Sequence, residues 1–133
     1  MVLARDEASG HPFEYARVIG IFHLDAVYNQ AGASDVAETY DVLWVRWYQR
    51  DISYRAGFEK KRLHRIEFIP SDNPGAFGFL NPDEVIRAAH LIPAFYHGGT
   101  EMLLKGLSVA RDEGEVDDWR YFYVNMRVLS GCF

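Results

Sequence analysis

Cysteine is almost absent from this chain, and its scarcity excludes two kinds of site. Cys132 is the only cysteine among 133 residues, so neither an intrachain disulfide nor a zinc site built on paired cysteines can form. So few thiols are typical of a reducing compartment. No apolar run approaches the roughly 18 residues of a membrane-spanning helix, and residues 1–7 lack the apolar stretch of a secretory signal. The sequence therefore predicts an intracellular protein, nuclear or cytoplasmic, with no membrane partner.

Positive charge is scarce as well. The chain has 14 Lys and Arg against 19 Asp and Glu, a formal net charge of -5, which fits poorly with the phosphates of nucleic acids. The chain nevertheless contains one basic cluster, formed by Lys60, Lys61, Arg62 and Arg65. This cluster could contact phosphates or act as a nuclear-import signal. Acidic residues flank the cluster and no stacking aromatic is interleaved with it. A solvated loop is therefore the favoured interpretation, and nucleic-acid contact is the alternative.

Catalytic signatures are missing from the sequence. No serine lies in a Gly-x-Ser-x-Gly turn, no glycine run has phosphate-binding spacing, and there is no His-Glu-x-x-His motif. His23 and Asp25 point to the same face of a predicted strand, and His90 and His97 flank another. These polar groups support a small hydrolase or nuclease as an alternative function. A catalytic zinc site needs three protein ligands, so the sequence favours no catalytic residue, no metal and no cofactor.

Aromatic and branched residues are what the chain does have, and they are densest at residues 40–48. The segment is predicted to be a strand with two faces. The inner face holds Leu43, Val45 and Trp47, and the outer, partly aromatic face holds Val42, Trp44, Arg46 and Tyr48. Aromatics make up 15% of the residues, which favours a small β core filled by large rings. A chain of 133 residues buries about two thirds of its unfolded surface as one domain.

The remaining elements follow from turn and cap residues. Residues 13–28 form one long bent strand with a bulge at Gly20, and the turn composition of residues 29–38 joins it to the aromatic strand as a hairpin. Asn81 and Pro82 predict the start of a short helix that carries Val85, Ile86 and Ala89. Short strands are predicted at 66–69, 90–95 and 119–126. The prediction is a mainly β fold, a single partly open barrel of five to seven strands at 13–126, with a flexible arm at 1–12 and a tail at 127–133.

The order of these elements resembles that of bromo-adjacent homology (BAH) domains, which are chromatin-associated, SH3-like β-barrels. The segments that carry the resemblance are residues 16–22, 43–48, 83–86, 91–93 and 119–123. The resemblance implies a barrel that binds a chromatin or protein partner.

The amino-acid sequence of several segments also resembles that of a family of uncharacterised proteins from mushroom-forming fungi that are linked to CACTA-type (Plavaka-like) transposase genes. These segments are residues 15–23, 43–47, 76–80, 82–87, 90–95 and 119–126. The resemblance implies a transposon-linked gene context and brings no catalytic residue with it.

A binding role is the function that the residues favour. Trp44, Tyr48 and Tyr54 could form an aromatic cage for a methylated lysine, since ring faces attract a desolvated cation. Cross-strand packing of the same rings is the simpler interpretation. The favoured prediction is a non-enzymatic module that binds a protein or chromatin partner. The alternatives are the hydrolase or nuclease named above, a functionless relic, or a domain that associates with itself, with a homodimer as one form.

Overall fold

The computed structural model describes residues 1–4, 11–27, 37–56, 62–115 and 117–125. Within these ranges the chain is mainly β and contains no helix of seven or more residues, which confirms the mainly β part of the predicted fold class. None of the helices there has the length and apolar character that crossing a membrane requires.

The described residues form ten strands and two short 3-10 helices. In chain order these are β1 (Val2–Leu3), β2 (Phe13–Glu14), β3 (Ala16–Ala26), β4 (Glu38–Arg50), β5 (Arg65–Phe68), β6 (Phe77–Leu80), η3 (Pro82–Glu84), β7 (Leu91–Pro93), η4 (Phe95–His97), β8 (Gly99–Thr100), β9 (Asp118–Trp119) and β10 (Phe122–Val124).

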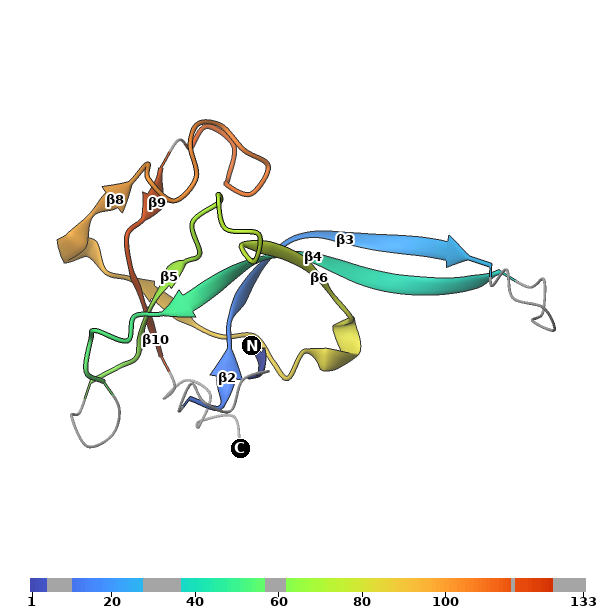
Figure 1. Ribbon diagram of the computed structural model, residues 1–133, viewed down its shortest axis with the longest axis horizontal. Helices are drawn as coiled ribbons and strands as arrows, with labels where there is room; N and C mark the ends of the chain where they lie inside the picture. The colour runs from blue at the N-terminus through green and yellow to red at the C-terminus, as the bar shows by residue number, and fades with distance from the viewer. Residues whose placement is uncertain (5–10, 28–36, 57–61, 116, 126–133) are drawn as a thin grey trace.

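One six-stranded antiparallel sheet organises the molecule. Its order is β3-β4-β5-β10-β7, and β6 also pairs with β4; the pairs β1-β2 and β8-β9 form two small separate sheets. The predicted barrel is not seen in the described part of the chain, because no pairing joins the two ends of this order. Instead of turning back toward β7, β3 follows β4 outward as a long two-stranded arm (Figure 1).

The β3–β4 hairpin matches the prediction in its pairing and in its bulge. The register runs from Ala16 opposite Trp47 to Ala26 opposite Glu38, and it shifts between Val18 and Gly20. A Cβ atom at Gly20 would lie 3.3 Å from the ring of Phe22, so the bulge position has little room for a side chain. The turn predicted at 29–38 lies mostly outside the described residues.

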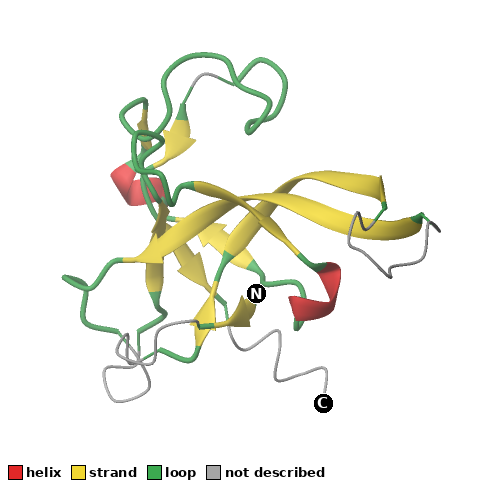
Figure 2. Cartoon of the chain, turned by 45° about the vertical axis from the view of Figure 1, so that its right-hand side comes forward, coloured by secondary structure: helices red, strands yellow, loops and turns green. Residues whose placement is uncertain are grey.

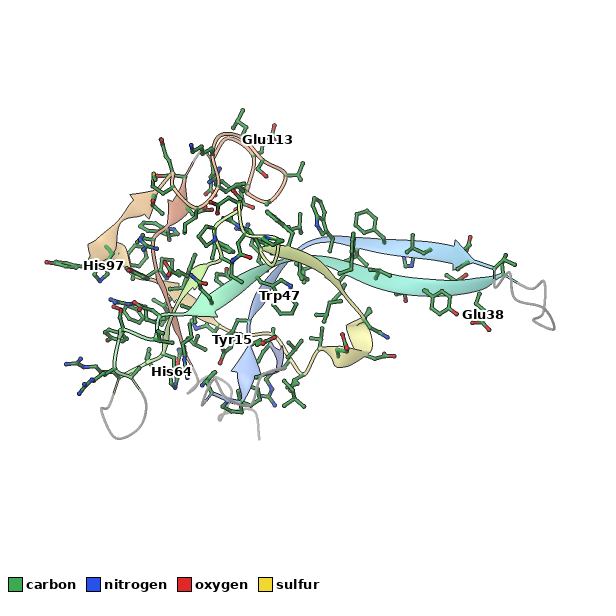
Figure 3. All side chains as sticks on the ribbon, in the orientation of Figure 1. Tyr15, Glu38, Trp47, His64, His97 and Glu113 are labelled. Atoms are coloured by element: carbon green, nitrogen blue, oxygen red, sulfur yellow. The ribbon has the colours of Figure 1, made fainter. Side chains whose placement is uncertain are left out.

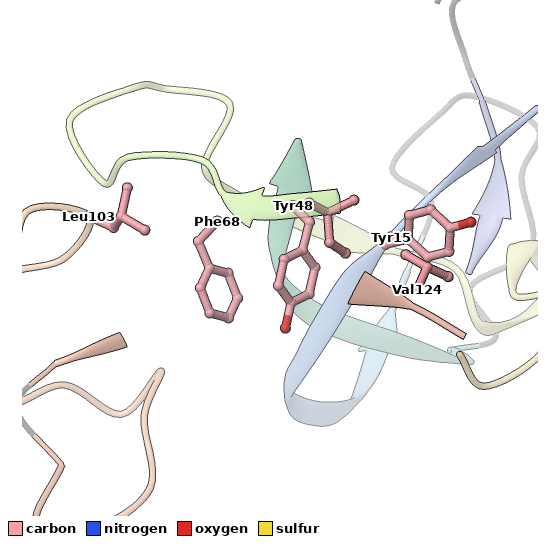
Figure 4. Packing of buried hydrophobic residues seen from close by; sticks show 6 residues of the cluster. Tyr15, Tyr48, Phe68, Leu103 and Val124 are labelled. Carbon is pink, nitrogen blue, oxygen red and sulfur yellow. The ribbon is translucent and has the colours of Figure 1, made fainter. Parts of the chain in front are cut away.

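The core consists of two clusters that lie against the second half of β4. One contains Leu43, Val45 and Trp47 of β4 with Val2 and Leu80. The other surrounds Tyr48 and is shown in Figure 4; its members are Tyr15, Tyr48, Ile66, Phe68, Leu103 and Val124. The predicted outer face of this strand is therefore not a free surface along its whole length.

Of the arm predicted at residues 1–12, residues 5–10 lie outside the described residues, and residues 1–4 contact the rest of the fold. Val2 is buried and lies opposite Glu14 in the β1–β2 pair. The Met1 amino group donates to the Arg87 carbonyl at 3.1 Å, and the Ile86 amide donates to the Met1 carbonyl at 3.0 Å. These bonds place the first residues within the fold.

The same bonds bear on the length of the predicted helix. The Asn81 side chain accepts from the Asp83 amide at 3.0 Å and Pro82 occupies the first turn, as predicted. The helix nevertheless ends at Glu84, and Val85 is extended. Because the Ile86 amide bonds to Met1, it is not available to a further helical turn.

Candidate interaction surface

The outer half of the β3–β4 hairpin extends away from the rest of the molecule (Figures 1 and 2). Every residue from Ile21 to Ala26 on β3 and from Glu38 to Asp41 on β4 is exposed. We call residues 20–27 and 37–44 the arm; at its base, Leu43 and Trp44 also pair with β6. A two-stranded ribbon without a covering layer is only marginally stable in water, so such an arm is expected to gain from contact with another surface.

The two faces of the arm differ in chemistry. Residues directly opposite each other in an antiparallel pair share a face, and here Phe22 lies opposite Val42, Leu24 opposite Tyr40, and Gly20 opposite Trp44. β6 extends this face, because Phe79 lies opposite Trp44 on the other side of β4. We call the set the apolar arm face: Phe22, Leu24, Tyr40, Val42, Trp44 and Phe79.

Much of the apolar arm face is open to solvent. The exposed fractions are 44% for Phe22, 52% for Leu24 and 72% for Phe79. Trp44 is half-buried at the base, with its ring centroid 6.4 Å from that of Phe22. Clustered apolar exposure of this kind marks an interaction site more often than isolated exposed residues do.

The opposite face of the arm is largely polar. His23 Nδ1 lies 2.5 Å from Asp41 Oδ1, and the Thr39 hydroxyl donates to Asp25 at 2.7 Å. Ile21 is an exposed apolar residue on this face. His23 and Asp25 therefore share a face, as predicted, but each contacts a different partner on β4.

The three rings predicted as a lysine cage lie in separate surroundings. Trp44 packs near Phe22 and Phe77, whereas Tyr48 is buried and stacks on Phe68 with ring centroids 4.2 Å apart. Four residues along a strand separate the two by about 13 Å, which is too far for both to enclose one cation. Tyr54 lies beyond the end of β4. These rings do not form one cage.

Tyr54 does bind a cation, but one that belongs to the chain itself. The Arg65 guanidinium carbon lies 4.2 Å from the ring centroids of both Tyr54 and Tyr121. Arg65 also donates two hydrogen bonds to Asp51 Oδ2, at 3.0 and 2.7 Å. Burial acts to raise the pKa of Asp51, but hydrogen bonds from Ser53 and Arg65 outweigh it, so the pKa lies below its ordinary value.

This pairing divides the predicted nucleic-acid cluster. Arg65 is directed into the Tyr54 and Asp51 contacts, while Arg62 is exposed and lies 5.9 Å from the Tyr54 ring. Lys60 and Lys61 lie outside the described residues. Contact between this cluster and phosphates stays a prediction.

The histidines that the hydrolase or nuclease alternative relies on lie in different parts of the molecule. His23 is on the arm, His90 Nδ1 lies 3.3 Å from Asn125 Nδ2, and His97 Nε2 lies 3.2 Å from Arg65 Nη1. Figure 3 shows His97 at the end of the molecule opposite Glu38, which marks the outer part of the arm. In the described ranges no group of three or more His, Cys, Asp or Glu side chains is placed to hold a metal ion.

Sequence reasoning missed a buried charge cluster. Arg46 is fully buried on β4 and donates to both oxygens of Asp118, at 2.8 and 2.9 Å. Arg111 donates to the same two oxygens, each at 3.1 Å, and to the carbonyls of Gly106 and Leu104. The only signal in the sequence was a charged residue placed between Trp44 and Tyr48 in an apolar strand.

Electrostatics keeps this cluster ionised. Burial acts to raise the pKa of Asp118, but hydrogen bonds from Arg46 and Arg111 outweigh it and the pKa is lowered. The Arg46 guanidinium carbon lies 3.8 Å from the Phe68 ring centroid. The cluster ties β4 to β9 and to the loop before it, and so it anchors the base of the arm.

A second polar cluster lies beside a cavity of about 480 Å³ whose lining includes His11, Tyr15, Trp47 and Arg50. The rings of His11 and His64 are 4.4 Å apart, and His11 Nε2 lies 2.9 Å from the Tyr15 hydroxyl oxygen. Burial, with His64 and Arg50 nearby, lowers the pKa of His11 to about 4. This cavity offers an uncharged imidazole at neutral pH.

Comparison with protein-family models, with curated proteins and with solved structures found no match to this chain.

Proposed function

We propose that this chain is a non-enzymatic module that binds a protein partner through the apolar arm face. The observation that carries the proposal is the partition of the arm into a polar face and an apolar face that is open to solvent. Leu24 and Phe79 are more than half exposed, although Leu80, the neighbour of Phe79 in β6, lies in the core. Burial of such surface is the main favourable term in protein association.

The chemistry of the face favours a protein over a nucleic acid. No Lys or Arg belongs to the apolar arm face, so it has no group that would neutralise phosphates. Rigid aromatic rings are the residues that dominate protein interfaces. The resemblance to BAH domains and to transposon-linked proteins suggests chromatin as the setting of the partner.

A pair of photo-crosslinking variants tests the proposal. A photo-reactive amino acid replaces Leu24 on the apolar face in one protein and its neighbour His23 on the polar face in the other. We expect nuclease-treated nuclear extract to give protein adducts with the Leu24 variant and few with the matched His23 variant. Equal adduct yields from the two faces, or none from either, would contradict the proposed surface.

A further inference from the structure

The apolar arm face carries almost no charge, and this limits what can cover it. Glu38 continues the same face beyond Tyr40 at its outer end, where it lies opposite Ala26 and accepts from the Tyr40 hydroxyl at 2.6 Å. A basic or phosphorylated partner would find no row of opposite charges on this face. The matching surface is another uncharged apolar one, and a second copy of the chain provides it.

A two-fold axis would keep the two Glu38 carboxylates of a dimer apart. If the arms pack face to face and antiparallel, Glu38 of one copy lies toward the Phe79 end of the other. The two Glu38 carboxylates are then at opposite ends of the contact. Such an arrangement is isologous: the same patch is used twice about a two-fold axis, and the interface closes after two copies.

The exposed area is sufficient for a small dimer. Phe22, Leu24, Tyr40 and Phe79 are each between 41% and 72% exposed. With large side chains of roughly 200 Å², these four residues together offer about 400 Å². The partly buried Val42 and Trp44 bring the whole face to about 500 Å² per copy. Two copies would bury about 1,000 Å², which is the lower limit for a specific interface.

The low intrinsic stability of the arm is a further reason to expect a partner that is always bound to its apolar face. An unsupported two-stranded ribbon is marginal in water, and in this one residues 21–26 of β3 and 38–41 of β4 are all exposed. A partner that is present whenever the chain is present satisfies this need. We infer that a second copy of this chain covers the apolar arm face, with the two arms packed face to face about a two-fold axis.

The inference rests on the proposed function, since it names the partner at the same surface. Sedimentation velocity on the purified protein, over a wide concentration range, tests it. We expect the wild type to sediment as a dimer. The double variant Leu24→Ser with Phe79→Ser is expected to raise the dimer dissociation constant by roughly a hundredfold, through two lost apolar contacts.

The control changes the polar face by the same kind of substitution. His23→Ser with Thr39→Ala is expected to leave the dimer dissociation constant within about threefold of wild type. Circular dichroism in the aromatic region checks that both variants keep the fold, and Phe79→Ser alone provides a change outside the hairpin. A folded wild type that stays monomeric at all concentrations, or equal dissociation of both double variants, would overturn the inference.

The two proposals fail separately. A monomeric purified protein that still gives extract adducts from the Leu24 position would remove the second copy and leave the binding module. Adducts that consist only of the chain itself would support the dimer and leave no other partner at this face.

Discussion

The two halves of β4 have opposite surroundings, although they belong to one continuous strand. Residues 38–41 are exposed, whereas Leu43 and residues 45–48 are buried. In the second half β3 lies on one side and β5 and β6 lie on the other, while the segment carrying Asp118 covers Arg46. The comparison teaches that alternation sets the faces of a strand, and that its neighbours decide whether a face is buried.

The largest loss of stability is expected from removing Asp118, the carboxylate that pairs with Arg46 in the buried half of β4. Asp118→Ala would leave Arg46 and Arg111 buried without their carboxylate, which costs about 3–5 kcal/mol of unfolding free energy. Asp112→Ala is the matched control, because its bond to Arg17 is exposed and worth about 1 kcal/mol at most. Urea unfolding measures both; similar losses would show that the buried cluster is not the anchor of the arm.

A pair of leucines tests the comparison directly. Leu43→Ala in the buried half should cost about 2–5 kcal/mol by cavity formation, whereas Leu24→Ala in the exposed half should change the monomer by about 0.5 kcal/mol or less. Urea unfolding at high dilution gives the monomer values. If a second copy covers the arm, the unfolding free energy lost by Leu24→Ala should be larger at high protein concentration. Equal losses for Leu24→Ala and Leu43→Ala would contradict the contrast between the exposed and the buried half of the hairpin.

Acid should lower the stability of the fold through His11. The pKa of His11 is depressed to about 4 in the folded chain against 6.5 in the unfolded chain, so the unfolded state binds more protons between these values. Stability is therefore full above about pH 6.5 and is lost as the pH falls toward 4, by an amount on the order of 1 kcal/mol given the partial exposure of the ring. Unfolding free energy measured against pH checks this. His11→Asn should flatten the slope in this window, and an unchanged slope would remove His11 as its source.

The smallest loss of stability is expected at Arg65, whose guanidinium lies over the Tyr54 ring beyond the end of β4. Tyr54→Ala removes one ring from Arg65 and should cost about 0.5–1 kcal/mol, whereas Tyr54→Phe keeps the ring face and should cost less. Thermal unfolding of the two variants provides the measurement. If both variants lose the same amount, the ring face is not what stabilises Arg65.

Local signals in the sequence predicted local features. The Gly20 bulge, the β3–β4 hairpin and the cap at Asn81 and Pro82 could be predicted because they depend on neighbours along the chain. The early end of the helix could not, since it depends on a bond from the Ile86 amide to Met1, distant in sequence. For the same reason the sequence did not predict that the sheet stays open within the described residues.

The candidate surface was predicted in part. The aromatic outer face of the strand was recognised, and Trp44 does belong to the apolar arm face. The proposed cage was not formed, because Tyr48 turns into the core and Tyr54 is stacked on Arg65. Residue types alone cannot tell which cation or which ring a side chain meets after folding.

The sequence by itself determined a β fold, its long hairpin and the faces of its strands, because alternation and turn chemistry act over a few residues. Only the tertiary structure decided that Arg46 lies buried against Asp118 and that Leu24 stays in solvent. Both outcomes depend on which distant segments meet β4, and contacts between distant segments are not written in the local pattern of either one.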